Sequence, residues 1–398
     1  MYYSSKTDRY LQYLLLTFGF LFPLSVFLGN FLAIVILISF LFLEEKRTKL
    51  IHLFGNKLFR SIAIFFFLHI VGLLWSEDIQ GGLEMIRKML EFGILFPVLV
   101  ILMHKKNIDL YINSFLLAAV VIILFSFLIW FGVIPPFKNA TVGNPTPFMS
   151  HITHGPFIAF SSYISLMKFF NNFNSKNNIS YLYLFLFLIF SFNVFITGGR
   201  AGHVVYLVLL LIGLIQYYGF RPKVFIMGVC SVLIIFITAY QYSGIFKKRI
   251  DALTTEIVEF NEEDNHSTSV GKRLIYLQNS MRIFKDNIFI GVGTGGFPKE
   301  YAKYNDIYSE GSPLSTNPHN MYLLLIVQFG LIGLLCLLSI HFYQIKHRIK
   351  DNKFHSHLGF GLVAYFFVIN FSDSYLLGHF TSFLFIFFSS FLYQIEKY

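Results

Sequence analysis

Residues 11–43, "LQYLLLTFGFLFPLSVFLGNFLAIVILISFLFL", form one apolar stretch without a charged side chain. A helix that crosses the hydrocarbon core of a bilayer needs roughly 20 apolar residues. The stretch is long enough for two crossings, which we place at residues 10–27 and 29–43. It follows Lys6 and Arg9, as a secretion signal would, but it is too long for a signal and has no small-residue cleavage site.

Apolar stretches of similar length recur through the rest of the chain. Of the 398 residues, 56% are hydrophobic and only 13% are charged, which excludes a soluble domain of this size. We therefore predict an all-α polytopic membrane protein with about twelve transmembrane helices. The predicted spans are residues 10–27, 29–43, 61–75, 90–104, 109–132, 155–169, 180–197, 201–219, 223–241, 319–345, 357–374 and 378–394. One large loop separates spans nine and ten, which divides the chain into residues 1–241, 242–318 and 319–398.

The basic residues indicate how the chain is oriented. A formal net charge of +10 is typical of nucleic-acid binding, but here Lys and Arg lie in short loops between spans, which is the pattern of membrane topogenesis. We therefore expect no nucleic-acid partner. The short loops on one side contain only four of these residues: Arg87, Lys88, Lys138 and Arg200. By the positive-inside rule this side is the outer face, so both termini are cytoplasmic and the large loop faces outward.

Neither a metal site nor a cofactor is expected. Cys230 and Cys336 lie in the middle of apolar stretches, where they act as small hydrophobic residues. His151 and His154 have a one-turn spacing, but no carboxylate or cysteine stands nearby to complete a metal site.

The stretch "NPHNMYLLLIVQFGLIG", residues 317–333, places a histidine at the start of span ten. Asn317 is a good N-cap and Pro318 a preferred first helical residue, so we expect His319 in the first turn. The helix dipole and the free N–H groups there disfavour imidazolium, so the ring should be neutral near pH 7, as a general base must be. The alternative is an interfacial histidine that only hydrogen-bonds a loop.

Three further residues support this region. Gly330 and Gly333 would allow a neighbouring helix to approach span ten closely and to fix it. Asp373, near the outer end of span eleven, is costly unless it is paired or hydrated. It would therefore orient a histidine or line a cavity.

A second candidate is "TGGRAG", residues 197–202, on the same face between spans seven and eight. Thr197 can cap span eight, the two glycines permit a nest of backbone N–H groups, and Arg200 adds a forked cation beside a helix N-terminus. This combination predicts a phosphate cradle. The alternative is an ordinary turn with a topogenic arginine, although an arginine on the outer face runs against the charge trend.

A third candidate is "WSEDIQGGLEMIRKML", residues 75–90, which places Arg87 and Lys88 on the outer face. Both run against the charge trend. Glu84 and Lys88 could also pair at helical spacing, so a solvated amphipathic helix is the alternative.

The large loop contains further cations. Leu274, Leu277, Met281 and Phe284 are spaced like one helix face, and the glycine turn "GVGTGG" ends that helix. Arg273 and Arg282 lie near this turn. It lacks the lysine and the serine or threonine of a phosphate loop, so nucleotide binding is not expected.

The predicted topology places a base and several cations on one face. The base is His319 and the cations are Arg200, Arg87 and Arg273. The carboxylate of Asp373 lies on the same face. A neutral base beside cations suggests transfer chemistry on an anionic, lipid-anchored substrate. Because no ATP site is visible, the substrate itself would supply the energy, as a sugar diphosphate lipid does.

Three motifs resemble the O-antigen ligase and O-antigen polymerase superfamily of bacterial envelope proteins. They are "TGGRAG", "GKRLIYLQNSMRIFKDNIFIGVGTGGF" at residues 271–297, and "HNMYLLLIVQFGLIGLL" at residues 319–335. The single dominant loop that ends in His-Asn is more similar to the ligases. Two positions depart from the family pattern: Gly199, where serine is frequent, and the residues after Arg273, where tryptophan is common.

The resemblance implies a metal-independent, inverting glycosyltransferase of lipopolysaccharide biosynthesis in the bacterial inner membrane. Its donor would be a glycan on undecaprenyl diphosphate at the periplasmic face, and its acceptor the lipid A core oligosaccharide. The membrane spans would form a lipid-facing groove for the prenyl tail.

The resemblance also implies roles for residues at matching positions. His319 would deprotonate or orient the acceptor hydroxyl, with Asn320, Gly330, Gly333 and Asp373 in support. The diphosphate would be held by Arg200 and Arg273, with weaker support from Arg87 or Lys88 and from Arg282.

Two alternatives stay open. An O-antigen polymerase or a protein O-oligosaccharyltransferase would use the same site and donor with another acceptor. A transporter of lipid-linked glycan would bind the diphosphate without breaking it, and would need charged or discontinuous elements at mid-membrane depth. Most of the candidate residues cluster at one surface instead.

Overall fold

The computed structural model describes residues 6–44, 46–138, 140–173, 178–262, 266–348 and 352–393. These residues form helices and the loops between them, and their only β-structure consists of two isolated bridges. The predicted all-α class is confirmed for this part of the chain. The last residue of predicted span 378–394 and the outer ends of predicted segments 1–241 and 319–398 lie outside the described residues.

Seventeen α-helices follow one another along the described chain. Their bounds are α1 Lys6–Leu21, α2 Val26–Leu41, α3 Lys46–Leu53, α4 Lys57–Val71, α5 Ile79–Leu90, α6 Phe96–Leu102, α7 Ile108–Trp130, α8 His151–Asn172, α9 Ile179–Ile196, α10 Arg200–Tyr218, α11 Pro222–Tyr242, α12 Gly244–Glu262, α13 Ser269–Asp286, α14 Phe297–Tyr308, α15 Met321–His347, α16 Lys353–Ile369 and α17 His379–Leu392. The π-helical turn η2, Glu91–Leu95, joins α5 to α6, and the 3-10 turns are η1 Gly72–Trp75, η3 Lys105–Asn107 and η4 Tyr375–Leu377.

Six helices of the described chain are long and apolar enough to cross a membrane, or up to seven if the bent pair α2 and α3 is one span. The six are Lys57–Trp75, Lys105–Trp130, α9, α10, α11 and α15. The other predicted spans coincide with helices that are shorter or more polar. A polytopic membrane protein is therefore supported, while the count of twelve spans stays a prediction.

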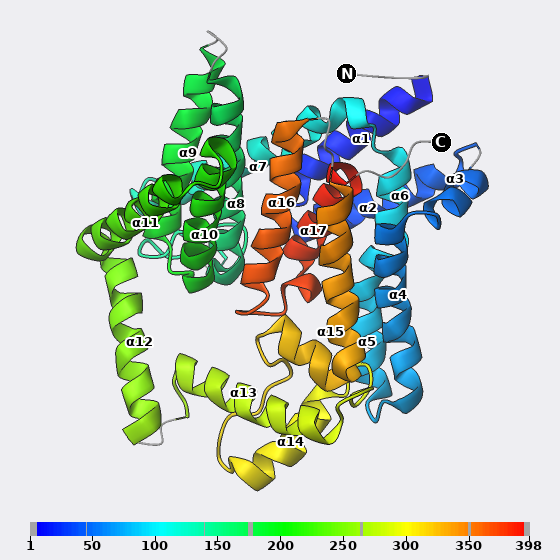
Figure 1. Ribbon diagram of the computed structural model, residues 1–398, viewed down its shortest axis with the longest axis vertical. Helices are drawn as coiled ribbons and strands as arrows, with labels where there is room; N and C mark the ends of the chain where they lie inside the picture. Colours follow the sequence, from blue (N-terminus) through cyan, green and yellow to red (C-terminus); the bar gives the residue numbers. More distant parts are fainter. Residues whose placement is uncertain are drawn as a thin grey trace.

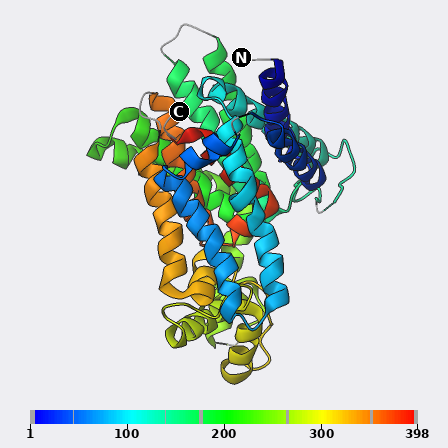
Figure 2. The same cartoon turned by 90° about the vertical axis from the view of Figure 1, so that its right-hand side faces the viewer.

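The helices of the large loop lie at one end of the molecule. Figure 1 shows α13 and α14 together at the end opposite to the start of α1, with α12 leading towards them from α11. In Figure 2, α4, α5 and α15 run side by side towards the same end. The face of the membrane on which this end lies stays a prediction.

Phenylalanine rings fill the centre of the helix bundle. Phe115 of α7 and Phe388 of α17 meet edge to face with ring centroids 5.0 Å apart, and Phe18 of α1 meets Phe383 at 5.3 Å. All four side chains are buried. Such pairs contribute about 0.5–1.5 kcal/mol beyond burial alone, so the aromatic residues join helices from both ends of the chain.

Glycines allow α8 and α10 to touch through their backbones. A Cβ atom at Gly202 would lie 2.6 Å from the backbone of Gly155, and one at Gly199 would lie 2.4 Å from the carbonyl oxygen of His151. No side chain fits at such distances, so both positions require glycine. The close approach fixes the turn before α10 against the start of α8.

We expect Gly202→Ala to lower the free energy of unfolding by about 1–3 kcal/mol, because the added methyl group overpacks the contact with α8. A thermal unfolding curve of the detergent-solubilised protein measures this. Gly143→Ala is the matched control, since a Cβ there has no neighbour within 4 Å. Equal unfolding temperatures for the two variants would contradict the close approach.

The helix α15 is interrupted at Gly330, where φ is 58° and ψ is −150°. The interruption frees backbone groups, and the segment before α14 binds them. The N–H of Val292 donates to the carbonyl of Val327 at 2.9 Å, that of Gly293 donates to Gln328 at 2.9 Å, and that of Leu331 donates to Ile288 at 2.8 Å. The glycine turn, residues 291–296, is therefore hydrogen-bonded to α15 at the interruption.

This finding corrects the predicted role of the two glycines of span ten. A neighbouring helix was expected against Gly330 and Gly333. Instead, the loop before α14 approaches Gly330, where a Cβ would lie 2.3 Å from the carbonyl oxygen of Ile288. At Gly333 a Cβ would meet Leu325 and Phe329 of the same helix. A positive φ within an apolar segment leaves no mark in hydropathy, so the sequence pattern did not reveal the interruption.

The buried face of α13 also differs from the predicted one. Leu277 is 42% exposed, while Ile275, Asn279 and Ile283 are buried. Asn279 turns inward because its amide donates to the hydroxyl of Ser309, just after α14, at 2.7 Å. Counting only apolar residues therefore placed the face about one position away from the true one.

Candidate functional site

Two loops meet where α15 begins and α16 ends. The side-chain carbonyl of Asn317 accepts from the backbone N–H of His319 at 3.0 Å and from the hydroxyl of Ser374 at 2.8 Å. The amide of Asn320 donates to the carbonyl of Phe371 at 3.2 Å. These bonds fix the loop that contains His319 to the loop that follows α16.

The start of α15 differs from the predicted one. The helix begins at Met321, and the side chain of Asn320 accepts from the N–H groups of Tyr322 and Leu323 at 2.9 and 3.1 Å. His319 precedes this cap with a positive φ of 51°. The prediction of Asn317 as N-cap and His319 in the first turn is therefore wrong. Asn320 has the extended backbone that an N-cap requires, whereas Asn317 supports the loop.

His319 pairs with a carboxylate from the second loop. Its Nδ1 lies 3.3 Å from Oδ1 of Asp373, and its ring stacks on Tyr276 of α13 with centroids 6.0 Å apart. The side chain of His319 is 40% exposed and that of Asp373 is 20% exposed. A carboxylate at Nδ1 holds the proton on that nitrogen, so the lone pair of Nε2 is free to face a substrate.

Three arginines share one pocket of about 150 Å³, called here the arginine pocket. Arg200 is the first residue of α10, Arg249 lies in α12 and Arg273 lies in α13. His151 lies beside them at the start of α8. Burial lowers the pKa of His151, and the charge of Arg249 lowers it further, so this ring adds no positive charge at neutral pH.

Glu256 of α12 positions Arg200 within this pocket. Its Oε1 accepts from Nη2 of Arg200 at 3.1 Å, and its Oε2 accepts from the N–H of Val270 at 2.8 Å. One carboxylate thus connects α10 to the start of α13. Nε of Arg200 is buried and finds no partner among the described residues, so the guanidinium retains a free donor.

The turn before α10 is arranged differently from the predicted cap. The hydroxyl of Thr197 donates to the carbonyl of Val194 in α9 at 3.1 Å, and Gly199 stands at the N-cap of α10 without a side-chain bond. Thr197 therefore ends α9 and does not cap span eight. The N–H of Gly198 donates to the side chain of Asn144 at 2.9 Å, so this part of the expected nest is already bound.

Reasoning from the sequence missed Arg249 and Glu256. Arg249 closes the run Lys247 to Arg249 directly after predicted span 223–241. This run lies on the predicted outer face, where basic residues run against the charge trend, and that anomaly was the available signal. Glu256 follows seven residues later on the same helix, and no local pattern links it to Arg200.

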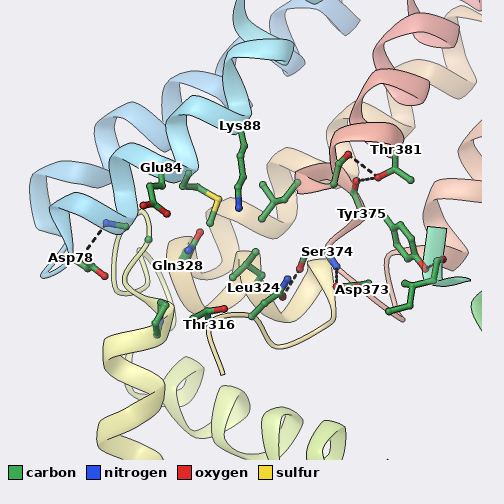
Figure 3. A pocket seen from close by; sticks show the side chains of 18 of the residues that line it. Asp78, Glu84, Lys88, Thr316, Leu324, Gln328, Asp373, Ser374, Tyr375 and Thr381 are labelled. Atoms are coloured by element: carbon green, nitrogen blue, oxygen red, sulfur yellow. Dashed lines mark hydrogen bonds between the residues drawn. The ribbon is translucent and has the colours of Figure 1, made fainter. Parts of the chain in front are cut away.

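A larger cavity of about 670 Å³, called here the polar cavity, adjoins the arginine pocket. Ile152 and Tyr375 line both spaces, and the hydroxyl of Tyr375 donates to the carbonyl of Ile152 at 2.9 Å. Figure 3 shows the residues around the polar cavity. They include Asp78, Glu84 and Lys88 of or beside α5, Thr316, Asn317, Gln328, Asp373 and Thr381. His319 is not among them, but its partner Asp373 is.

The remaining predicted cations lie apart from the arginine pocket. Lys88 lines the polar cavity instead, and Arg87 on the same helix is exposed and lines neither space. The guanidinium of Arg282 lies 4.5 Å from the ring centre of Tyr308 and donates to Asn279 at 2.8 Å. Arg282 therefore connects α13 to α14. Of the predicted cations, only Arg200 and Arg273 are brought together.

An apolar groove of about 1060 Å³ lies between α9 and α11. Its lining includes phenylalanines of α9, among them Phe192 and Phe195, and isoleucines of α11. Lys248 also lines it and directly precedes Arg249 of the arginine pocket. The groove thus comes within one residue, along the chain, of the arginine pocket.

Cys230 and Cys336 are both free thiols. Among the described residues, no group of three or more His, Cys, Asp or Glu side chains is placed to hold a metal ion.

The chain is similar to known proteins in the region that builds this site. Residues 185–338 match the family model described as O-antigen ligase, and this range contains all three arginines of the pocket, the glycine turn and His319. A protein of Haemophilus influenzae is 25% identical over 310 residues, which are 76% of this chain and 74% of that protein. That protein is described only as uncharacterized, so it adds no activity. The predicted resemblance to the O-antigen ligase superfamily is confirmed over residues 185–338, and members of that family are glycosyltransferase-like enzymes of envelope glycan assembly.

Proposed function

We propose that this chain is an O-antigen ligase of the bacterial inner membrane. It would transfer a glycan from undecaprenyl diphosphate to the lipid A core oligosaccharide at the periplasmic face, in lipopolysaccharide biosynthesis. One observation supports this most: three arginines share a pocket that also contains Ser372, and the next residue, Asp373, holds His319. Cations for a leaving diphosphate and a base for an acceptor are thus neighbours.

The arginine pocket fits the diphosphate of the donor. Guanidinium groups bind phosphate oxygens through paired hydrogen bonds, and Arg200 retains a free Nε donor for such a bond. When the bond between the anomeric carbon and the diphosphate oxygen breaks, that oxygen takes the electron pair. Arg200, Arg249 and Arg273 stabilise the negative charge that develops there.

His319 would act on the acceptor. Nε2 takes the proton of the attacking hydroxyl while Asp373 holds Nδ1–H and stabilises the imidazolium that forms. The new bond between the hydroxyl oxygen and the anomeric carbon forms on the face opposite to the diphosphate, so the configuration is inverted. Undecaprenyl diphosphate is released.

The apolar groove between α9 and α11 fits the prenyl tail. Its lining includes several Phe and Ile side chains, and Lys248, which also lines it, directly precedes Arg249 of the arginine pocket. A lipid that lies in the groove would therefore present its diphosphate to the three arginines.

The proposal is tested with purified protein, undecaprenyl-diphosphate glycan and lipid A core oligosaccharide, with the products measured by mass. A ligase forms the glycan–core conjugate and releases undecaprenyl diphosphate. Longer lipid-linked glycans would indicate a polymerase, and glycan on added protein would indicate an oligosaccharyltransferase. Binding of the donor without any bond cleavage would indicate a transporter and would overturn the proposal.

Chelation of divalent cations is expected to leave the transfer rate unchanged, because the arginines supply the positive charge that a metal ion otherwise provides. The rate with and without EDTA in the same assay measures this. A loss of activity with EDTA that Mg²⁺ or Mn²⁺ restores would contradict the metal-independent mechanism.

A further inference from the structure

Gln328 is a buried side chain without a partner. It is 1% exposed, it lines the polar cavity, and neither its Oε1 nor its Nε2 forms a hydrogen bond with the described residues. A buried amide that is left unpaired destabilises the fold, because it has lost its hydrogen bonds to water and gained none. Buried polar groups of this kind require an explanation, and a ligand in the cavity would supply one.

The backbone holds Gln328 firmly in this position. Its carbonyl accepts from the N–H of Gly293, and it stands two residues before the interruption of α15 at Gly330. The glycine turn and the helix therefore fix the base of the side chain together. A rigidly held amide with a free donor and a free acceptor suits recognition of a ligand.

Glu84 and Lys88 of α5 line the same cavity on the side facing Gln328 (Figure 3). Their spacing would allow an ion pair, but no ion pair or hydrogen bond joins them to each other or to another described residue. The three side chains thus offer a carboxylate acceptor, an ammonium donor and an amide that is both. Hydroxyl groups, which donate and accept, are the complement of this set.

We infer that the polar cavity is the acceptor site, and that Gln328, Glu84 and Lys88 bind the hydroxyl groups of the acceptor saccharide. This inference rests on the proposed function. It assigns Lys88 to the acceptor and not to the diphosphate. The volume of about 670 Å³ lies within the range of about 300–1,000 Å³ that small-molecule sites occupy.

The position of the cavity favours the acceptor over the donor. Inversion requires the attacking hydroxyl and the leaving diphosphate on opposite sides of the anomeric carbon. Ile152 and Tyr375 separate the polar cavity from the arginine pocket. Asp373, the partner of His319, faces the polar cavity. A diphosphate among the arginines therefore leaves the polar cavity to the acceptor.

The test uses the full-length protein with Gln328→Met, Glu84→Met and Lys88→Met, each of which replaces a hydrogen-bonding side chain by an apolar one of similar length. Native mass spectrometry measures the Kd of two probes separately: delipidated core oligosaccharide and undecaprenyl diphosphate. Each substitution should weaken oligosaccharide binding about tenfold, as the loss of a hydrogen-bonded group does, and leave undecaprenyl diphosphate binding unchanged. Gln278→Met and Lys285→Met, on the exposed surface of α13, are the matched controls.

Thermal unfolding separates this role from a structural one. Because the amide of Gln328 has no protein partner, Gln328→Met should unfold at the same temperature as the wild type or above it. A lower unfolding temperature would show that the amide stabilises the fold and would overturn its assignment to a ligand.

Three outcomes distinguish the inference from the proposed function. If the oligosaccharide Kd of the variants equals that of the controls, the inference is overturned even when the wild type transfers glycan. If the variants weaken undecaprenyl diphosphate binding instead, the cavity is a donor site and the inference is again overturned. If the wild type transfers no glycan but the three substitutions weaken oligosaccharide binding, the proposed function fails and the saccharide site is supported.

Discussion

Replacing His319 by alanine is expected to lower kcat for glycan transfer by about 10²–10⁴-fold, the usual contribution of a positioned general base. Nε2 would take the acceptor proton, and no other described base pairs with Asp373. The KM for the donor should change little, because the arginines hold the diphosphate. Steady-state rates of product formation with the purified variant measure both constants.

Asp373→Asn is the companion variant for this experiment. It preserves the shape of the side chain but removes the negative charge beside Nδ1, so the loss of kcat should be smaller than for His319→Ala. Because the two residues act as a unit, the double variant should be no slower than His319→Ala alone. Independent, multiplying losses would show that Asp373 acts elsewhere, and a His319→Ala protein with more than about a tenth of the wild-type kcat would contradict the role of His319 as a base.

The second large effect is expected at Arg249. Arg249→Ala should lower kcat/KM for the donor by about 10²–10³-fold, because it removes one of three cations that stabilise the leaving diphosphate. The kcat/KM of Arg249→Lys should lie between those of the wild type and Arg249→Ala, since lysine keeps the charge but loses the forked guanidinium that binds two oxygens. Initial rates at varied donor concentration measure the effect.

Lys247→Ala is the control for Arg249. Lys247 lies on the same helix, contacts the ring of Tyr240 at 5.7 Å and lines neither the arginine pocket nor the polar cavity. The activity of the Lys247→Ala protein should equal that of the wild type. If Lys247→Ala lost as much activity as Arg249→Ala, the loss would reflect the general charge of α12 and not the pocket.

The class of the fold follows from the sequence because burial in a bilayer demands long apolar segments, and each predicted span overlaps at least one helix of the described chain. The details that failed depend on tertiary contacts. Asn317 and Asn320 are both suitable caps, and only the second loop, which binds Asn317, decides between them. The buried face of α13 includes Asn279, whose partner Ser309 is distant in sequence.

The candidate site is likewise predictable from the sequence only in part. The separate motifs around Arg200, Arg273 and His319 are visible in the sequence because each has a local signature. Their joint geometry is not, since Arg200 is oriented by Glu256 from another helix. Arg249 is easily missed because it lies in the large loop, where the positive-inside rule gives basic residues little weight. Gln328 gave no signal at all, because its unpaired amide is evident only once its neighbours are known.

The interruption of α15 has a consequence for biogenesis. The carbonyl groups of Val327 and Gln328, which lose their helical partners at the interruption, accept hydrogen bonds from the glycine turn that precedes α15 in the chain, and an unpaired peptide group in lipid costs several kcal/mol. Insertion of this span is therefore incomplete until the turn has docked. Since the turn precedes α15 in the chain, it leaves the ribosome first and is ready when the span arrives.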